Sequence, residues 1–321
     1  MKKVLKRITA FFLLCLFIMI SGIWTLAYNY EEDLKSFVIS ELQLNLTREI
    51  ELGVKRMDYS ILYHFPHISV DIPDLRVYSF KKEDQNLVKL KEISLVFDVF
   101  SILNGDLILN EILLKDGELN IIYDQDGLPN FKIWKERNNS SNQKSTISIE
   151  KIELINVNVS YQHFARSQDY KLHFDKLNVS PEKLTDSIVL SSTLKGNVLL
   201  IKESDFYWKQ TIPLSGSFDL SVISGLVKFN FSGNLLDKDA HLNGSINQIG
   251  KEAIWDIDFG IKNLSISKTV PILPSSISYH QLTNLAGNLD LNGIIKGTKT
   301  FRKEPFLQID FILNSGSINT C

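Results

Sequence analysis

Hydrophobic and polar residues alternate with a period of two along most of this chain. Apolar residues occupy every odd-numbered position from Ile93 to Val99, and the alternation returns from Leu119 to Tyr123 and again over 255–261. Successive side chains of a β-strand point to opposite faces of a sheet, so this period predicts strands with one apolar and one polar face. Clusters of Asn, Asp, Ser and Gly separate the alternating segments, as turns do. The pattern therefore predicts a mainly β protein of many short strands.

The alternation changes phase at two places in the N-terminal third. The apolar positions change parity at Lys91 and Glu92, and a similar change occurs at Asn110 and Glu111. One extra residue in one strand of a pair produces such a change, so both sites predict β-bulges. Pro73 lies inside another alternating segment. It indicates a strand edge or a further bulge, because proline has no N–H to donate to a ladder.

The same period continues between turn residues to the end of the chain. Asp116 with Gly117, and residues 124–127, have the composition of turns. Most of the later turns are expected at six glycines: Gly196, Gly216, Gly225, Gly233, Gly244 and Gly250. The later strands are expected at 170–179, 188–195, 197–201, 207–212, 216–222, 226–232, 240–246, 254–261, 285–296 and 306–313.

Two segments near the C-terminus interrupt this pattern. Residues 265–276 hold two prolines and predict a short helix or a crossing loop. Residues 315–321 read as a turn and the start of a strand with no partner after it. An unpaired strand edge invites aggregation, so we expect a truncated chain or one that another polypeptide completes.

The N-terminus has the pattern of a membrane anchor. Residues 1–7 carry four basic side chains, and residues 8–28 carry no charge. A helix of that length spans about 30 Å, the thickness of a bilayer's hydrocarbon core. A cleaved signal peptide is the alternative, but its apolar region usually has about 7–15 residues before a small-x-small cleavage site. We predict a cytoplasmic tail, an uncleaved anchor and an exported remainder, because the basic side stays in the cytoplasm.

Residues 29–50 have helical rather than strand periodicity. Leu34, Phe37, Val38 and Leu42 fall at i, i+3, i+4 and i+8 and form a single apolar stripe. This spacing predicts an amphipathic helix between the anchor and the first strands.

The rest of the chain divides into a first β unit at 51–134, a polar linker at 135–145 without apolar residues, and further β repeats at 146–321. The apolar pattern before the linker recurs after it at a constant offset of 40 residues, which suggests repeated strand units. The matching positions are Leu107, Leu109, Ile112, Leu114, Leu119 and Ile121 with Ile147, Ile149, Ile152, Leu154, Val159 and Tyr161.

Composition argues against several classes of protein. The net charge is −2 and no basic stripe is interleaved with aromatic residues, so we expect no nucleic-acid partner. The two cysteines are Cys15, inside the predicted anchor, and Cys321, the last residue. Cys15 follows no small residue and fits a buried apolar cysteine better than a lipid attachment site. Cysteines so placed make neither a structural disulfide nor a thiolate metal site.

The histidines do not form a convincing metal site. His64 and His67 lie three residues apart at the entry to a strand, and no cysteine or third histidine lies near them in sequence. A surface turn explains this pair better than metal ligation does, so we predict no metal and no cofactor.

No carboxylate pair makes a convincing catalytic site either. Glu31 and Glu32 suit the first turn of a helix, where they complement its dipole. Asp256 and Asp258 suit the polar face of a strand. No phosphate-binding loop or nucleophile elbow is present. We therefore predict no catalytic residues and no enzyme activity.

Aromatic residues recur at alternating strand positions. A sheet core or the lining of a groove explains them better than a stacking platform for a ligand does. They include Phe97, Tyr123, Tyr161, Phe229 and Phe231.

Three short segments occur in a fixed order in the N-terminal third. FPHIS at 65–69 precedes a strand, SILNGDLILNEI at 101–112 leads into the next, and DQDGLPNF at 124–131 follows. This order resembles the N-terminal region of the AsmA family of Gram-negative envelope proteins. The resemblance covers about residues 1–135, so that 51–134 corresponds to the β unit of that family. Family members usually continue well beyond the length of this chain.

The resemblance implies a bacterial inner-membrane protein whose single anchor and short helix lead into an elongated, curled antiparallel β-sheet groove of repeating strands in the periplasm. By the same resemblance, larger members carry phospholipid toward the outer membrane along such a groove. A two-faced sheet must cover its apolar face, with acyl chains in an open groove or with a second sheet in a closed sandwich. Alternation alone does not separate these two cases.

We therefore expect a protein of phospholipid transport or outer-membrane lipid homeostasis that binds acyl chains on an apolar concave face. The alternative is an assembly factor or scaffold for outer-membrane proteins, which another envelope protein would join at the strand edge near 306–313. The expected partners are phospholipid and the inner membrane. The candidate groove residues are Ile93, Leu95, Phe97, Leu119, Ile121, Val157 and Val159.

Overall fold

The computed structural model describes residues 50–51, 58–60, 67–78, 86–98, 101, 108–131, 149–184, 187–203, 206–250, 252–266, 285–300, 303 and 305–318. Most of them lie in β-strands, as the alternation predicts. The predicted tail, membrane anchor and polar linker lie outside the described residues, as does the amphipathic helix except for its last residue, Ile50. No helix in the described part of the chain is long and apolar enough to cross a membrane.

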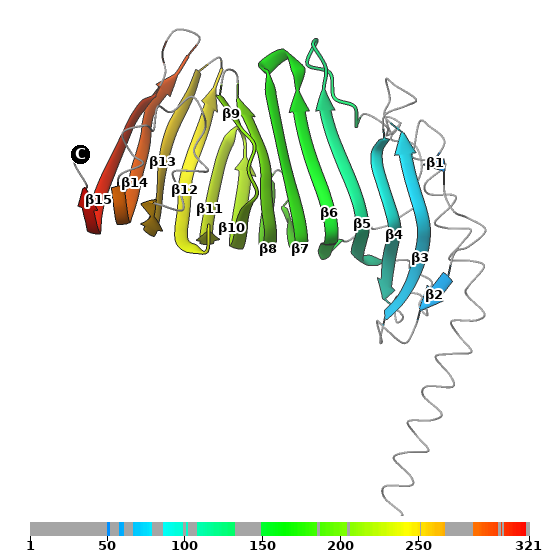
Figure 1. Cartoon of the computed structure of the whole chain (residues 1–321). Coiled ribbons are helices and arrows are strands. Elements are labelled where there is room, and N and C mark those ends of the chain that lie inside the picture. The colour runs from blue at the N-terminus through cyan, green and yellow to red at the C-terminus, as the bar shows by residue number, and fades with distance from the viewer. Residues whose placement is uncertain are drawn as a thin grey trace, which may run out of the picture.

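A single curled sheet contains every strand of the described residues (Figure 1). The strands are β1 (Ile50–Glu51), β2 (Asp58–Ser60), β3 (His67–Tyr78), β4 (Asn86–Asp98), β5 (Leu109–Tyr123), β6 (Lys151–His163), β7 (Gln168–Leu184), β8 (Ser187–Glu203), β9 (Phe206–Trp208), β10 (Ile212–Ile223), β11 (Leu226–Leu235), β12 (Lys238–Ile249), β13 (Glu252–Ser265), β14 (Leu285–Lys299) and β15 (Phe306–Ile318). Thirteen of them lie side by side in chain order, while β2 pairs with β3 and β9 pairs with β8. The sheet therefore grows strand by strand along the chain.

One pair of strands departs from the expected antiparallel arrangement. β5 and β6 run parallel, whereas every other pair of described strands is antiparallel. Glu111 pairs with Lys151 and Tyr123 with His163, an offset of 40 at each end of the ladder. The 40-residue repeat predicted from the sequence is thus a pair of adjacent strands in register. Parallel neighbours need a long connection, and the chain between Tyr123 and Lys151 supplies it.

Most of the glycines assigned to turns lie inside strands instead. The segments predicted at 188–195 and 197–201 are one strand, β8, with Gly196 in its middle. A Cβ on Gly196 would lie 2.0 Å from the carbonyl oxygen of His173, so glycine is required there by the close approach of β7 and not by a turn. Gly216, Gly233 and Gly244 likewise lie within β10, β11 and β12. Gly225 and Gly250 do lie in turns, with φ of 86° and 61°.

Of the other predicted turns, one is confirmed and two are wrong. The carboxylate of Asp124 accepts hydrogen bonds from the N–H groups of Asp126 and Leu128 at 2.9 and 2.8 Å, which closes the turn after β5. Asp116 and Gly117 lie within β5. The segment from 315 to 318 continues β15 against β14. The predicted helix or crossing loop at 265–276 lies outside the described residues beyond Ile266.

The phase change at Asn110 is the bulge that the sequence predicts. Val96 pairs with Glu111, but the next residue, Phe97, pairs with Leu109, so Asn110 is an extra residue in β5. Its backbone carbonyl accepts a hydrogen bond from the N–H of Glu150 at 2.7 Å, just before β6 begins.

The phase change at Lys91 has a different cause from the predicted bulge. The register of β3, β4 and β5 does not shift there, because each of the three strands carries one additional residue at the same level. Asp74 and Asp116, opposite Lys91 on the two sides, have positive φ values of 52° and 51°. The same level continues into β6 at Asn156, with φ of 55°, and into β7 at Asp175, where the register against β8 shifts.

We call this line the crease: Asp74, Lys91, Asp116, Asn156 and Asp175. An additional residue in every strand changes the parity of the apolar positions without turning them to the other face. Pro73 immediately precedes Asp74, and no described residue pairs with it on the side of β3 away from β4, which agrees with the predicted edge or bulge.

The best-buried side chains gather where β3 to β7 lie together. Leu90, Leu154 and Val157 are among the buried residues of one cluster, and they lie on both sides of the crease. A side chain of this size contributes about 1.5–3 kcal/mol when fully buried. The partly buried residues packed against the cluster are Val88, Ile93, Leu114, Leu119, Ile152, Val159, Phe174 and Leu177.

Candidate functional site

The two faces of the sheet differ in chemistry. Residues paired across neighbouring strands share a face, so the registers assign the side chains to one face or the other. Leu119 pairs with Val88 and with Val159, and apolar partners continue in this way as far as β15. We call this side the apolar face. It includes Ile72, Leu75, Leu90, Ile93, Leu119, Leu154, Val157, Leu172, Leu194, Phe218, Phe231, Leu242, Ile257, Phe259, Ile295, Leu307, Ile309, Phe311 and Leu313.

The seven candidate groove residues all lie on the apolar face. Four of them pack into the cluster between β3 and β7: Ile93, Leu119, Val157 and Val159. The other three belong to the same face by register: Leu95, Phe97 and Ile121. Phe97 and Val157 are only 1% and 0% exposed, whereas the remaining five are partly exposed. Their contact with lipid stays a prediction.

The apolar face is well buried at β3 and most exposed at β15. Ile68, Val70 and Ile72 on β3 are buried, whereas Ile309 and Phe311 on β15 are 40% and 64% exposed. Contacts between elements run mainly between neighbours in the sheet, and the described residues contain no second sheet that could cover this face. Ile257, Ile261 and Leu264 on β13 are still buried on this face. Within the described part of the chain, the apolar face is therefore most open at β15.

An aromatic cluster borders the apolar face at the edge where β5 and β6 end and β7 begins. We call it the aromatic rim: Tyr123, Phe131, Tyr161, His163 and Tyr170, with Gln168 and Glu203 beside them. Two cross-strand rows build it. One row runs from Tyr123 through His163 and Gln168 to Glu203, and the next includes Tyr161 and Tyr170.

The rings of the rim stack on one another. The ring centroids of Tyr123 and His163 are 5.0 Å apart with planes at 8°, and those of Tyr161 and Tyr170 are 5.8 Å apart with planes at 19°. Phe131, from the turn after β5, meets Tyr123 edge-on at 5.8 Å. Such rings place an apolar body over the apolar face and a polar tip toward water.

A carboxylate lies at the end of the rim. Glu203 accepts hydrogen bonds from Gln168 Nε2 at 3.0 and 3.1 Å and from the hydroxyl of Tyr170. Burial and this hydrogen bond to Glu203 raise the pKa of the Tyr170 phenol, and burial raises the pKa of Tyr161. Both phenols are therefore neutral at physiological pH. No ion pair to Glu203 is formed among the described residues.

Sequence reasoning placed Tyr123 and Tyr161 on strands but missed the rim. Tyr123 and His163 are 40 residues apart, as are the paired residues of β5 and β6. The repeat offset could therefore have brought these two rings together. Nothing in the local sequence places Glu203 beside them, because that contact depends on the register of β7 against β8.

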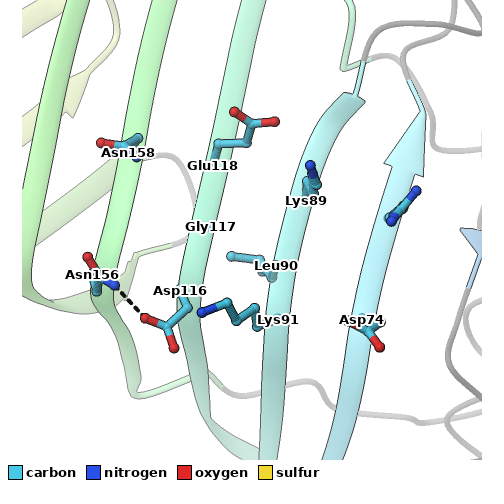
Figure 2. Close-up of a pocket in the computed structure, with 10 residues that line it drawn as sticks. Asp74, Lys89, Leu90, Lys91, Asp116, Gly117, Glu118, Asn156 and Asn158 are labelled. Atoms are coloured by element: carbon cyan, nitrogen blue, oxygen red, sulfur yellow. Dashed lines mark hydrogen bonds between the residues drawn. The ribbon is translucent and has the colours of Figure 1, made fainter.

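A pocket of about 350 Å³ lies on the polar face along the crease (Figure 2). The side chain of Asn156 donates to the carboxylate of Asp116 at 2.5 Å, and Lys91 extends toward Asp116 (Figure 2). Its ionisable residues balance in charge: Arg76, Lys89, Lys91, Asp74, Asp116 and Glu118. The pocket is therefore a polar hollow on the face opposite the apolar one, with no net charge to select a ligand.

The candidate acids and histidines lie on the surface of strands. Asp258 pairs with His241 at 2.9 Å and Asp256 with Lys296 at 3.4 Å, on the polar face of β13 and its neighbours. His67 is the first residue of β3, whereas His64, Glu31 and Glu32 lie outside the described residues. Among the residues that the structure describes, no group of three or more potential ligands is arranged to hold a metal ion.

No family model matches the sequence, and no curated protein or solved structure matches it either. Function is therefore inferred from the chemistry of the two faces of the sheet.

Proposed function

We propose that this chain is an inner-membrane-anchored periplasmic protein that takes part in phospholipid transport or outer-membrane lipid homeostasis, with acyl chains bound against its apolar face. The observation that carries the proposal is the apolar face itself, which runs from β3 to β15 and stays open toward β15 in the described part of the chain. The resemblance to the AsmA family supports the anchor and the periplasmic location.

Energetics favour a lipid cover for this face. Apolar surface left in water costs about 25 cal/mol per Å², and large exposed apolar patches on soluble proteins mark sites of interaction. Leu242 on β12 and Leu307, Ile309, Phe311 and Leu313 on β15 are each more than a third exposed. Acyl chains can cover such a face without forming hydrogen bonds, which suits a surface whose side chains are mainly apolar.

The sheet is large enough to hold several acyl chains side by side. Thirteen strands in order, spaced by about 4.8 Å, extend about 58 Å. This length exceeds the thickness of one bilayer, about 40–45 Å with its headgroups. We therefore propose a carrier or reservoir that acts with partners at one or both membranes.

Native mass spectrometry of the purified full chain, with lipid extraction alongside, tests this proposal. Bound phospholipid in near-stoichiometric amounts is the expected result. A lipid-free, monodisperse protein would contradict the proposal, because the apolar face would then be covered by the protein itself.

A second candidate function is supported by the edge strand. β15 pairs with β14 on one side, and apolar side chains are exposed on both of its faces, among them Phe306 and Ile312 opposite Phe311. Strand addition by another envelope protein would use such an edge, as an assembly factor would require. Photocrosslinking from Ile312 in cells tests this candidate. Crosslinks to an envelope protein would favour it, and crosslinks to lipid alone would favour the transport function.

A further inference from the structure

We propose that the aromatic rim binds the primary ammonium headgroup of a zwitterionic phospholipid whose acyl chains lie on the apolar face. The inference rests on the proposed lipid-binding function and adds to it a headgroup class and a site.

The first support is position. The rim borders the apolar face at one end of β5 and β6. Along each of these two strands, the apolar residues of that face are followed there by residues with polar groups. Tyr161 is followed inward on β6 by Val159, Val157 and Leu154, all on the apolar face. Tyr161 and Val157 are about 13 Å apart at about 3.3 Å per residue, and Tyr161 and Leu154 about 23 Å. The acyl layer of one leaflet is about 15 Å thick, so an acyl chain whose headgroup is bound at the rim would lie along these apolar residues of β6.

The second support is charge. Glu203 is exposed, is held in place by Gln168 and Tyr170, and forms no ion pair among the described residues. A positioned carboxylate without a cation suits a cationic ligand. The phenol groups of Tyr123 and Tyr161 add acceptor oxygens and ring faces that attract a cation.

The third support is a positive charge on the same rim. Arg166 ends the short helix η2 (Phe164–Arg166) that follows β6, and its charge acts on the phenol of Tyr161. A guanidinium group is well suited to a phosphate. The rim therefore presents one anionic and one cationic group, as a zwitterionic headgroup requires.

The stacking of the rings favours a primary over a quaternary ammonium. An aromatic cage for a quaternary ammonium needs several ring faces turned toward the ligand. Here Tyr123 lies against His163 and Tyr161 against Tyr170, with planes at 8° and 19°, so the ring faces are partly covered by one another. A primary ammonium has three N–H donors and can use oxygens at the ring edges and on Glu203 instead.

The experiment is a lipid competition on the full chain, followed by native mass spectrometry. The chain is incubated with equal amounts of phosphatidylethanolamine, phosphatidylcholine and phosphatidylglycerol that carry the same acyl chains. We expect phosphatidylethanolamine to be enriched about fivefold over phosphatidylcholine, in the range of a cation–π contact with an exposed ion pair. Glu203→Gln keeps the shape and the neighbouring side chains, and should abolish the enrichment while total bound lipid stays the same.

Two further variants separate charge at the rim from charge elsewhere. Glu182→Gln removes a carboxylate from the exposed polar face of β7, and should keep the wild-type lipid ratio. Arg166→Gln should lower binding of all three phospholipids together without changing the ratio of phosphatidylethanolamine to phosphatidylcholine.

The results that would overturn the inference differ from those that would overturn the proposed function. Bound lipid without headgroup preference in the wild type, or a preference that survives Glu203→Gln, would overturn the headgroup site alone. A wild-type chain that binds no lipid would overturn both. Free phosphoethanolamine is added in a parallel arm. Binding of this soluble amine at the rim with no effect on the amount or the headgroup ratio of bound phospholipid would assign the rim to a soluble ligand and overturn the lipid headgroup.

Discussion

Gly117 allows two strands to approach each other closely at the crease. It follows Asp116, and a Cβ at this position would lie 2.0 Å from the carbonyl oxygen of Lys89 and 2.8 Å from the Cα of Leu90. These are backbone atoms of β4, which cannot move aside as a flexible side chain can. The residue is therefore glycine because β4 and β5 approach closely, not because the chain turns.

Gly117→Ala should destabilise the sheet by about 2–4 kcal/mol, because the added methyl group forces β4 and β5 apart. Urea unfolding of the full chain measures the loss. Gly250→Ala is the control, because Gly250 has open space around it and only its φ of 61° opposes a side chain. It should cost about 1 kcal/mol. Equal losses for the two variants would contradict the close-approach explanation.

Leu119 tests whether the apolar face binds lipid in an open groove. Leu119→Asp should abolish lipid binding while the far-ultraviolet circular dichroism spectrum stays unchanged, because a carboxylate under acyl chains is unpaired and costs several kcal/mol. Ile122→Asp, on the opposite face of β5, should leave lipid binding intact. General unfolding of the Leu119 variant would instead mean that the residue lies in a closed core.

At the scale of elements, the parallel pair of β5 and β6 is supported by side chains that repeat with the strands. Residues 40 apart contact each other along the ladder: Lys151 with Glu111 at 3.4 Å and Ser160 with Asn120 at 2.6 Å. Glu153 then links Lys151, at 2.8 Å, to Lys176 on β7, at 2.9 Å. Charged side chains on the polar face therefore connect three strands.

This network predicts a pH dependence of stability. Burial raises the pKa of Glu153, but hydrogen bonds from Lys151 and Lys176 outweigh burial and hold the pKa below its ordinary value. A lowered pKa in the folded state stabilises the fold above the pKa of the unfolded chain, and this contribution is lost as the pH falls through the folded value. Glu153→Gln should cost about 1 kcal/mol at pH 7 and little at pH 3.

Thermal unfolding of both proteins from pH 7 to pH 3 measures the Glu153 contribution. The melting temperatures of wild type and variant should converge as the pH falls below about 4.5. Glu150→Gln, just before β6 and exposed, serves as the control and should follow the wild type throughout. A difference for Glu153→Gln that stays constant with pH would contradict the ionic origin.

Sequence reasoning found the strands but not how they pair. The parity of apolar positions located β3, β4, β5 and the bulge at Asn110, because alternation is a local property. Sequence reasoning assigned Gly196 to a turn, because the local sequence does not distinguish a glycine required by a close neighbouring strand from a glycine in a turn. The 40-residue offset between β5 and β6 was visible in the sequence. The offset alone does not show that the two strands are neighbours or that they run parallel.

The candidate site shows the same division between local and long-range information. Ile93 and Val159 were assigned to the apolar face from alternation alone, and the structure places both in one cluster. Glu203 joins Tyr170 only through the register of β7 and β8, and no local pattern specifies that register. Side chains on one strand could be predicted, whereas groups of side chains from several strands could not.

At the scale of the whole molecule, the N-terminal strands β3 to β6 are much better buried than the last described strand, β15. Val70, Phe97 and Val157 are almost fully buried, whereas Phe306 and Phe311 on β15 are more than half exposed. Strands with few buried contacts open more easily than well-packed ones. The two ends of one continuous sheet therefore differ in local stability.

Hydrogen exchange should reveal this difference. We expect amides of β4 to β7 to exchange slowest and those of β14 and β15 fastest, because local opening costs less where fewer side chains are buried. Added phospholipid should slow exchange most over β15, where the apolar face is most open. Uniform protection across the sheet, or protection by lipid confined to β4, would contradict this picture.

The crease has a consequence for how the length of these strands can change. Asp74, Lys91, Asp116, Asn156 and Asp175 each add one residue at the same level of successive strands. Removing one of them would keep that strand's apolar side chains on their face but displace half of its ladder by one step against both neighbours. Removing all five together would keep the pairing of these strands with one another. Viable insertions and deletions in this part of the sheet should therefore occur as matched sets across neighbouring strands. The five strands, although distant in sequence, are constrained to change length together.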